Sequence, residues 1–138
     1  MEPTKVDVLT GLARLRAAAD DGRLQAVAER LGVRVLGVFG SAARPGAVEP
    51  GDLDVAAGFV GPARELALLD ALTQLSGTDR LDLLVLDGAE PLARAEGFTG
   101  IGLFEATAGA WATEQMAALA ERRDTAHLRA VDRRALQG

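Results

Sequence analysis

Three aspartates in two short apolar segments are the residues of this sequence best suited to chemistry. Asp52 and Asp54 stand one residue apart at the start of an alternating run. On a β-strand such residues share a face, with Cα atoms about 6.5 Å apart, so both carboxylates can converge on one cation or bridge two. Carboxylate oxygens suit Mg²⁺. Two such ions about 4 Å apart can activate an attacking oxygen and stabilise a leaving phosphate. The simpler alternative is a pair of solvated aspartates at an exposed strand start.

Asp82 interrupts a second apolar run, between Leu81 and Leu83. An unpaired buried carboxylate costs several kcal/mol or takes up a proton. Asp82 therefore needs a cation, a metal ion or a place near solvent at a strand end. The last explanation is the ordinary one, since Asp79 and Asp87 also flank this run. If the Asp82 strand lies beside the Asp52 strand, however, the three carboxylates form one cluster that repels itself without a metal.

A Gly-Ser pair ends the apolar run that precedes these aspartates, and Arg44 follows it closely. A strand that ends in Gly-Ser and turns into a short helix presents free backbone N–H groups and a hydroxyl, which suit phosphate oxygens. Gly40 lets the backbone approach a ligand, Ser41 can donate to it, and Arg44 adds a permanent positive charge. Turns of this kind are generic, so the pair alone is weak support for a phosphate site.

Helical and strand patterns alternate along the chain. Thr4 with Asp7 three residues later resembles a capping box that opens the first helix. In the second strand Asp52 and Asp54 share a face opposite the apolar residues. The pattern predicts an α+β protein with a mixed sheet flanked by helices, as a single domain over residues 1–138 with its motif core at about 20–90. The expected helices cover residues 4–19, 24–31, 63–75, 89–96 and 107–136, and the expected strands cover 33–39, 52–60, 80–86 and, at an edge, 99–104.

Composition narrows the class of protein. Hydrophobic residues make up 49% and charged residues 25% of the 138 residues, which is typical of a globular domain. The absence of cysteine excludes disulfides, zinc–thiolate sites and a cysteine nucleophile. A net charge of −5 argues against direct binding of nucleic acid. The sequence shows no signal-peptide pattern and no apolar stretch of membrane-spanning length, so we expect a cytoplasmic protein without a membrane partner.

The combined spacing resembles one enzyme superfamily. Gly40-Ser41-Ala42-Ala43-Arg44, seven residues, and then Asp52-Leu53-Asp54 are similar to the G-S-x-A-R…D-x-D signature of the polymerase-β-like nucleotidyltransferases. The later Leu81-Asp82-Leu83 resembles the strand that carries their third carboxylate. This resemblance covers about residues 20–90. It implies ATP as a substrate and two Mg²⁺ ions held by Asp52, Asp54 and Asp82.

The resemblance also implies a role for each residue and a partner. Asp82 would help to activate the acceptor hydroxyl, while Gly40 and Ser41 would cradle the β- and γ-phosphates. The short chain is similar to the minimal nucleotidyltransferases, and its tail, Pro91-Leu92 followed by Gly102-Leu103-Phe104-Glu105, resembles their antitoxin branch. Members of that branch, in the HEPN/MNT toxin–antitoxin systems, are implied to transfer AMP from ATP to a tyrosine of a HEPN-domain toxin.

Two positions depart from the family pattern. Gly51 stands where the family usually has serine before the first aspartate, and Pro45 separates Arg44 from the following glycine. Neither change removes a metal ligand. Two alternatives stay open: a small-molecule nucleotidyltransferase of the aminoglycoside-modifying kind, and an antitoxin that acts by binding alone. The retained aspartates argue against the second, because a pure binder gains nothing from clustered like charges. The acceptor, the preferred base and the homo- or hetero-oligomeric state stay open.

Overall fold

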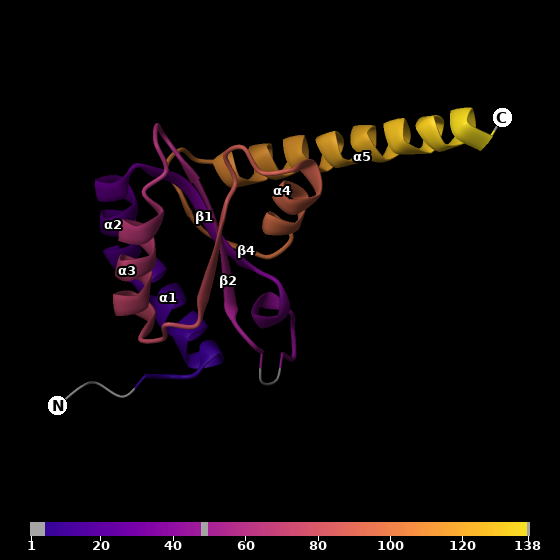
Figure 1. Cartoon of the computed structure of the whole chain (residues 1–138). Helices are drawn as coiled ribbons and strands as arrows, with labels where there is room; N and C mark the ends of the chain where they lie inside the picture. The colour runs from indigo at the N-terminus through magenta and orange to yellow at the C-terminus, as the bar shows by residue number, and fades with distance from the viewer. Residues whose placement is uncertain (1–4, 48–49, 138) are drawn as a thin grey trace.

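The chain folds into a four-stranded mixed sheet with helices on both faces (Figure 1). The computed structural model describes residues 5–47 and 50–137, with side chains up to residue 126. The predicted α+β class with a mixed, helix-flanked sheet is confirmed. In chain order the elements are α1 (Val8–Asp21), α2 (Arg23–Leu31), β1 (Val33–Phe39), the 3₁₀ turn η1 (Ser41–Ala43), β2 (Leu53–Phe59), α3 (Glu65–Ser76), β3 (Leu81–Val85), α4 (Pro91–Gly97), β4 (Ile101–Glu105) and α5 (Ala110–Gln137).

The strand directions gather the motif residues at one end of the sheet. The order is β3-β2-β1-β4, with β1 antiparallel to both β2 and β4, and β2 parallel to β3. The last residues of β1 and the first residues of β2 and β3 therefore meet at the same end, which we call the acidic end. The predicted edge strand is confirmed as β4. Gly100 permits its pairing, because a side chain there would collide with the carbonyl oxygen of Val38.

Helices cover the sheet on both sides, so β2 is buried on both faces. Helices α1, α2 and α3 lie on one face and α4 and α5 on the other (Figure 1). The predicted alternation of β2 is confirmed, since Leu53, Val55, Ala57 and Phe59 pack in one core cluster and Ala56 packs in the other. Ala56 and Gly58 are buried too, so the second face of the strand is covered beyond its first residues. The first face packs fully buried leucines: Leu15, Leu24, Leu36, Leu68 and Leu72. A second, smaller cluster around Phe98 and Val35 fills the other face.

Helix α1 begins later than the capping-box pattern predicts. Asp7 is the N-cap residue, and its carboxylate accepts a hydrogen bond from the backbone N–H of Thr10 at 2.7 Å. The prediction that Asp7 lies inside the helix is therefore wrong, because Asp7 itself satisfies an end N–H of α1. Thr4, the predicted cap, lies outside the described residues. The helix ends at Gly22, whose φ of 91° suits glycine.

Helix α5 is anchored to the sheet at its start and projects beyond the other elements (Figure 1). Trp111 packs over Gly37 and Gly102, where a Cβ atom at either glycine would approach the indole ring too closely. The Trp111 and Phe98 rings lie 4.8 Å apart, centroid to centroid, in a tilted arrangement. Met116, in the second turn of the same helix, is 71% exposed. No helix among the described residues is long and apolar enough to cross a bilayer.

A partly buried arginine, Arg34, stabilises the end of the sheet opposite the acidic end. Arg34 of β1 donates to both carboxylate oxygens of Glu114 on α5, with the shortest contact at 2.7 Å, and to Asp87 at 2.5 Å. It also donates to the carbonyl oxygen of Phe59 at 2.6 Å. The second oxygen of Asp87 accepts the Phe59 backbone N–H at 2.8 Å. These two carboxylates therefore serve to join α5 and the β3–α4 connection to the sheet.

Candidate active site

The structure brings the predicted aspartates together through the strand register. Asp54 is the direct partner of Asp82 across the parallel β2–β3 pair, and of Phe39 across the antiparallel β1–β2 pair. Asp52 lies two residues earlier on the same side of β2. The Asp54 side chain is partly buried, while Asp52 and Asp82 are exposed. Two of the carboxylates are thus exposed, and the third, that of Asp54, is less accessible.

Gly40 positions the Gly-Ser turn directly against the Asp54 carboxylate. Its φ of 73° and ψ of −155° are favourable for glycine, and an added Cβ atom would collide with Oδ2 of Asp54. Ser41 then begins η1 and is exposed. Among the described residues, the backbone N–H groups of Ser41 and Ala42 donate no hydrogen bond, whereas the next two in the turn bond to Gly40 and Ser41 carbonyl oxygens. These N–H groups are available to a ligand beside Asp54.

Electrostatic repulsion marks Asp54 as the centre of the acidic end. Burial raises the pKa of this carboxyl above its ordinary value, and the negative charges of Asp82, Asp52 and Glu96 raise it further. Within the described residues, Asp54 makes no ion pair of the kind that Arg34 makes with Asp87 and Glu114. A divalent cation bound at this end would relieve the repulsion.

The three carboxylates do not form a preformed metal cage. Within the residues described, no group of three or more His, Asp or Glu side chains is already arranged around a single point. The expected cluster is therefore looser than the sequence predicts: the residues are neighbours in the strand register, but their side chains are not grouped around one point. Mg²⁺ is commonly held by one or two carboxylates, substrate phosphates and water, without a complete protein cage. The exposed oxygens of Asp52 and Asp82 and the partly buried Asp54 fit such a donor set.

A cavity of about 340 Å³ opens beside the Gly-Ser turn. The turn and the loop after it supply one side, and the end of α4 supplies the other. Its lining residues are Gly40, Ala43, Arg44, Pro45, Glu96, Thr99 and Gly100. Glu96 is a fourth carboxylate of the acidic end that sequence reasoning missed. Glu96 is far from the other motif residues along the chain, and no local spacing in the sequence predicts that it lies at the acidic end.

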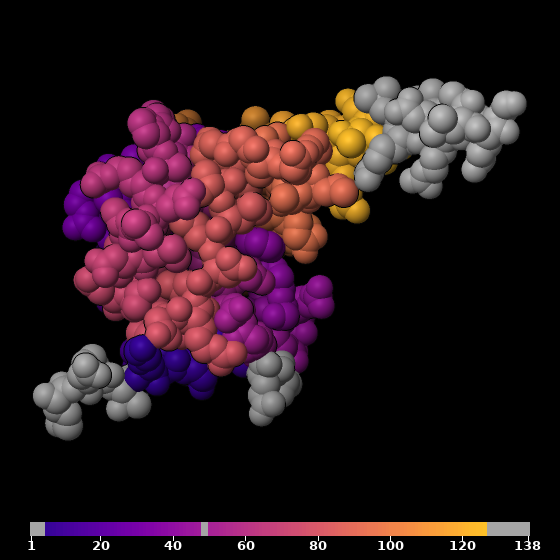
Figure 2. All heavy atoms as spheres, in the orientation of Figure 1, coloured from indigo at the N-terminus to yellow at the C-terminus, as the bar shows by residue number. Residues whose placement is uncertain are grey.

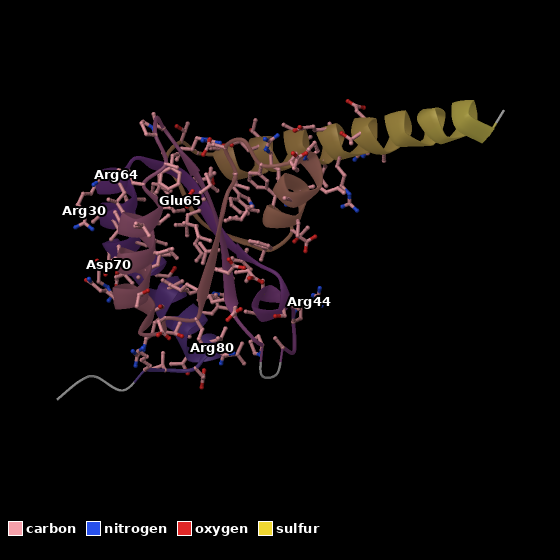
Figure 3. The ribbon with its side chains drawn as sticks, in the orientation of Figure 1. Arg30, Arg44, Arg64, Glu65, Asp70 and Arg80 are labelled. Atoms are coloured by element: carbon pink, nitrogen blue, oxygen red, sulfur yellow. The ribbon has the colours of Figure 1, made fainter. Side chains whose placement is uncertain are left out.

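Other charged residues near the motif have different partners. Arg80, just before β3, places Nε 3.9 Å from Oδ1 of Asp52, and both side chains are more than half exposed. Asp79 pairs with Lys5 at 2.5 Å. Figure 3 shows Arg44 and Arg80 on opposite sides of the loop that joins η1 to β2. On the face in Figure 2, the violet 41–47 segment reaches the surface beside the β3–α4 region.

Comparison with known proteins decides the fold. No family model matches this sequence, and no curated protein matches it. Solved structures do match. A chain of a toxin–antitoxin complex with AMP-PNP aligns with a TM-score of 0.64 at 14% identity, over 86% of this chain and 99% of the other. The chain has the fold of the MntA antitoxins.

Two further MntA-type structures agree with this match. One is a complex of MNT antitoxin with the tri-AMPylated HEPN toxin of Shewanella oneidensis, with a TM-score of 0.61 at 14% identity over 89% of this chain and 99% of the other. The second is an MntA–HepT complex, with a TM-score of 0.59 at 14% identity over 86% and 97% of the two chains. The predicted resemblance to the antitoxin-type minimal nucleotidyltransferases, which rested on the Gly-Ser and Asp-x-Asp motifs, the short chain and the tail, is therefore confirmed at the level of the fold.

Proposed function

We propose that this protein is an antitoxin that transfers AMP from ATP to a hydroxyl of a HEPN-domain toxin, with Mg²⁺ as cofactor. The observation that carries the proposal is the register of Asp54 with Asp82 beside a Gly-Ser turn, on an MntA fold. The AMP-PNP complex and the AMPylated toxin complex among the structural matches support the nucleotide and the acceptor proposed here.

Each motif residue has a proposed task. Asp52, Asp54 and Asp82 would hold Mg²⁺, which when bound would neutralise phosphate charge and favour ionisation of the attacking hydroxyl. The N–H groups of the Gly40–Ser41 turn would hold the β- and γ-phosphates, with Arg44 close by. Glu96 lines the same cavity, so we place it toward hydrogen-bond donors of the nucleoside rather than toward the phosphates, which would repel it.

The proposed reaction is an in-line displacement at the α-phosphorus of ATP. The acceptor oxygen forms a bond to that phosphorus while the bond to the bridging oxygen of the β-phosphate breaks, and pyrophosphate leaves with the electron pair. The hydroxyl proton passes to Asp82 or to solvent beside it. Positioning and charge neutralisation supply most of the rate, as is general for phosphate chemistry.

The test uses the co-encoded helical toxin as the acceptor. The purified pair is incubated with ATP and MgCl₂, and the intact mass of the toxin is followed. We expect the toxin to gain one or more adenylyl groups. An ATP analogue with a methylene bridge between the α- and β-phosphorus atoms is the control, because it binds but does not release AMP. A stable complex whose toxin never gains mass would instead support an antitoxin that acts by occlusion.

A further inference from the structure

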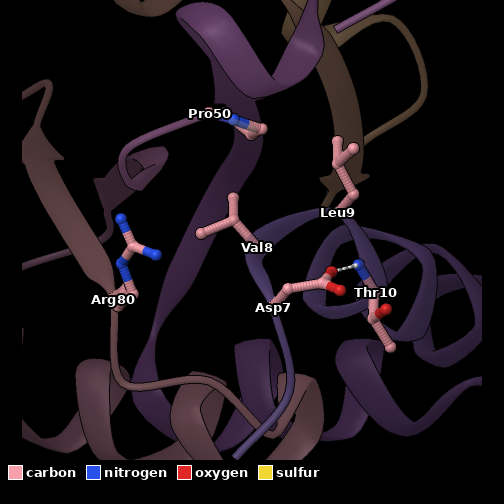
Figure 4. Close-up of a pocket in the computed structure, with 6 residues that line it drawn as sticks. All are labelled: Asp7, Val8, Leu9, Thr10, Pro50 and Arg80. Atoms are coloured by element: carbon pink, nitrogen blue, oxygen red, sulfur yellow. Dashed lines mark hydrogen bonds between the residues drawn. The ribbon is translucent and has the colours of Figure 1, made fainter. Parts of the chain in front are cut away.

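A second cavity lies beside the acidic end but outside the phosphate turn. It has a volume of about 630 Å³, within the range of ligand sites. Figure 4 shows its walls, which come from the start of α1, from the loop before β2 and from the start of β3. The lining residues are Asp7, Val8, Leu9, Thr10, Pro50 and Arg80.

This cavity adjoins the proposed metal ligands through Arg80. The guanidinium Nε of Arg80 lies 3.9 Å from the carboxylate of Asp52. The Arg80 carbonyl oxygen accepts the backbone N–H of Leu53 at 2.8 Å, which fixes this corner to the start of β2. One wall of the cavity is therefore attached to the strand that carries Asp52 and Asp54.

Among the described residues, this cavity and the one beside Gly40 share no lining residue. Arg44 and Pro45 line the smaller cavity, whereas Pro50 lines the larger one. Asp54 lies against Gly40 of the smaller cavity, whereas Asp52 lies near Arg80 of the larger one. Attacking and leaving oxygens lie roughly in line on opposite sides of the transferred phosphorus. If pyrophosphate departs on the Gly40 side, the acceptor must approach from the side of Arg80.

We infer that the larger cavity receives the hydroxyl-bearing segment of the acceptor protein, and that Arg80 selects a segment with an acidic residue near the hydroxyl. This inference rests on the proposed function. Arg80 is cationic and more than half exposed, and a cation at Asp52 would release it for an incoming carboxylate. Asp7 already accepts the Thr10 N–H, while Leu9 and Pro50 offer apolar surface to an aromatic ring.

Charge reversal of one arginine in each cavity tests whether the larger cavity receives the acceptor, with the co-encoded toxin as acceptor. For Arg80→Glu we expect the KM for toxin to rise about tenfold or more, with the KM for ATP within about twofold of wild type. For Arg44→Glu we expect the KM for ATP to rise about tenfold or more, with the KM for toxin within about twofold of wild type. Arg64→Glu, an exposed change outside both cavities, is the matched control and should leave both constants unchanged. A rise in the KM for ATP alone with Arg80→Glu would overturn the inference.

A binding measurement separates this inference from the proposed chemistry. A photo-crosslinking phenylalanine analogue replaces Leu9 inside the cavity or, as control, the exposed Leu66 of α3. We expect the toxin to be captured from position 9 and not from position 66, whether or not AMP is transferred. If the toxin gains AMP but position 9 captures none, the cavity assignment is wrong and the proposed function stands. Capture without AMP transfer under any condition leaves the docking surface intact and refutes the transferase.

Discussion

The two ends of the sheet hold carboxylates in opposite electrostatic settings. At one end, Asp87 and Glu114 contact the guanidinium of Arg34 at 2.5 and 2.7 Å. At the acidic end, Asp54 and Asp82 are neighbours across two strands. The cation paired with Asp52 in the described structure is Arg80, whose Nε lies 3.9 Å from Oδ1 of Asp52. The first arrangement satisfies its charges and joins elements. The second leaves the negative charges of Asp54 and Asp82 without an ion pair among the described residues, as expected of a site that binds a cation together with a phosphate.

The pKa directions express the same contrast. Glu114 and Asp87 raise the pKa of the Arg34 guanidinium, since both stabilise its charged form. Burial and three neighbouring carboxylates raise the pKa of Asp54, which means that its charged form is disfavoured. A protein gains stability from the first set of contacts and loses some to the second. Retaining an unfavourable cluster is typical of functional sites.

The largest effect should come from removing a carboxylate at the acidic end. We expect Asp52→Asn, Asp54→Asn and Asp82→Asn each to lower the rate of AMP transfer by at least about 100-fold, because each would remove one of the proposed metal ligands. Stability without metal should hold or improve. Asp79→Asn, which touches Lys5 at the surface, is the matched control and should transfer normally. Near-normal transfer by Asp82→Asn would remove that residue from the site.

The second effect concerns the opposite end of the sheet. Replacing Arg34 with leucine leaves Asp87 and Glu114 without their shared partner, so we expect a loss of about 2 kcal/mol in the free energy of unfolding. The rate of AMP transfer by the folded variant at low temperature should change little. Urea denaturation measures the stability, with Arg30→Leu on the exposed side of α2 as control. Equal stability of the two variants would show that the Arg34 contacts do not hold the fold.

The smallest effect is a pH dependence of stability. Because the pKa of Asp54 is raised above 3.8 in the folded state, the native protein binds more protons than the unfolded chain between that value and the raised one. Its stability therefore falls as pH rises through this interval. Asp54→Asn lacks this loss, so its Tm advantage over wild type in EDTA should grow from about pH 3.5 to pH 7. An advantage that shrinks with rising pH would contradict the raised pKa.

Sequence reasoning succeeded where the signal is local. The Gly-Ser turn and the Asp-x-Asp pair are each contained in a few residues, and a strand's period of two fixes which face the pair shares. The apolar run at residues 33–39 predicted the bounds of β1 correctly. Asp82 could be assigned to the same cluster as Asp52 and Asp54, because few structural roles explain a single acidic residue within an apolar run.

Features that depend on distant parts of the chain could not be predicted. Glu96 reaches the acidic end through the packing of α4, and nothing in its own neighbourhood indicates a site. Asp87 looked like an ordinary strand-end aspartate, yet its role depends on Arg34 and Phe59, more than 25 residues away. The burial of both faces of β2 likewise depends on where α4 and α5 pack, which periodicity within the strand does not reveal.

Calorimetric titration of ATP tests the central claim most directly, with the protein in excess MgCl₂ and then in EDTA. The account predicts that binding requires the divalent cation, because a bare triphosphate would meet the negative charges of Asp52, Asp54 and Asp82 at short range. Affinity should fall by at least about tenfold in EDTA, and Asp54→Asn should lessen that difference. Equal affinity for ATP with and without the cation would contradict a metal-bridged site at the acidic end of the sheet.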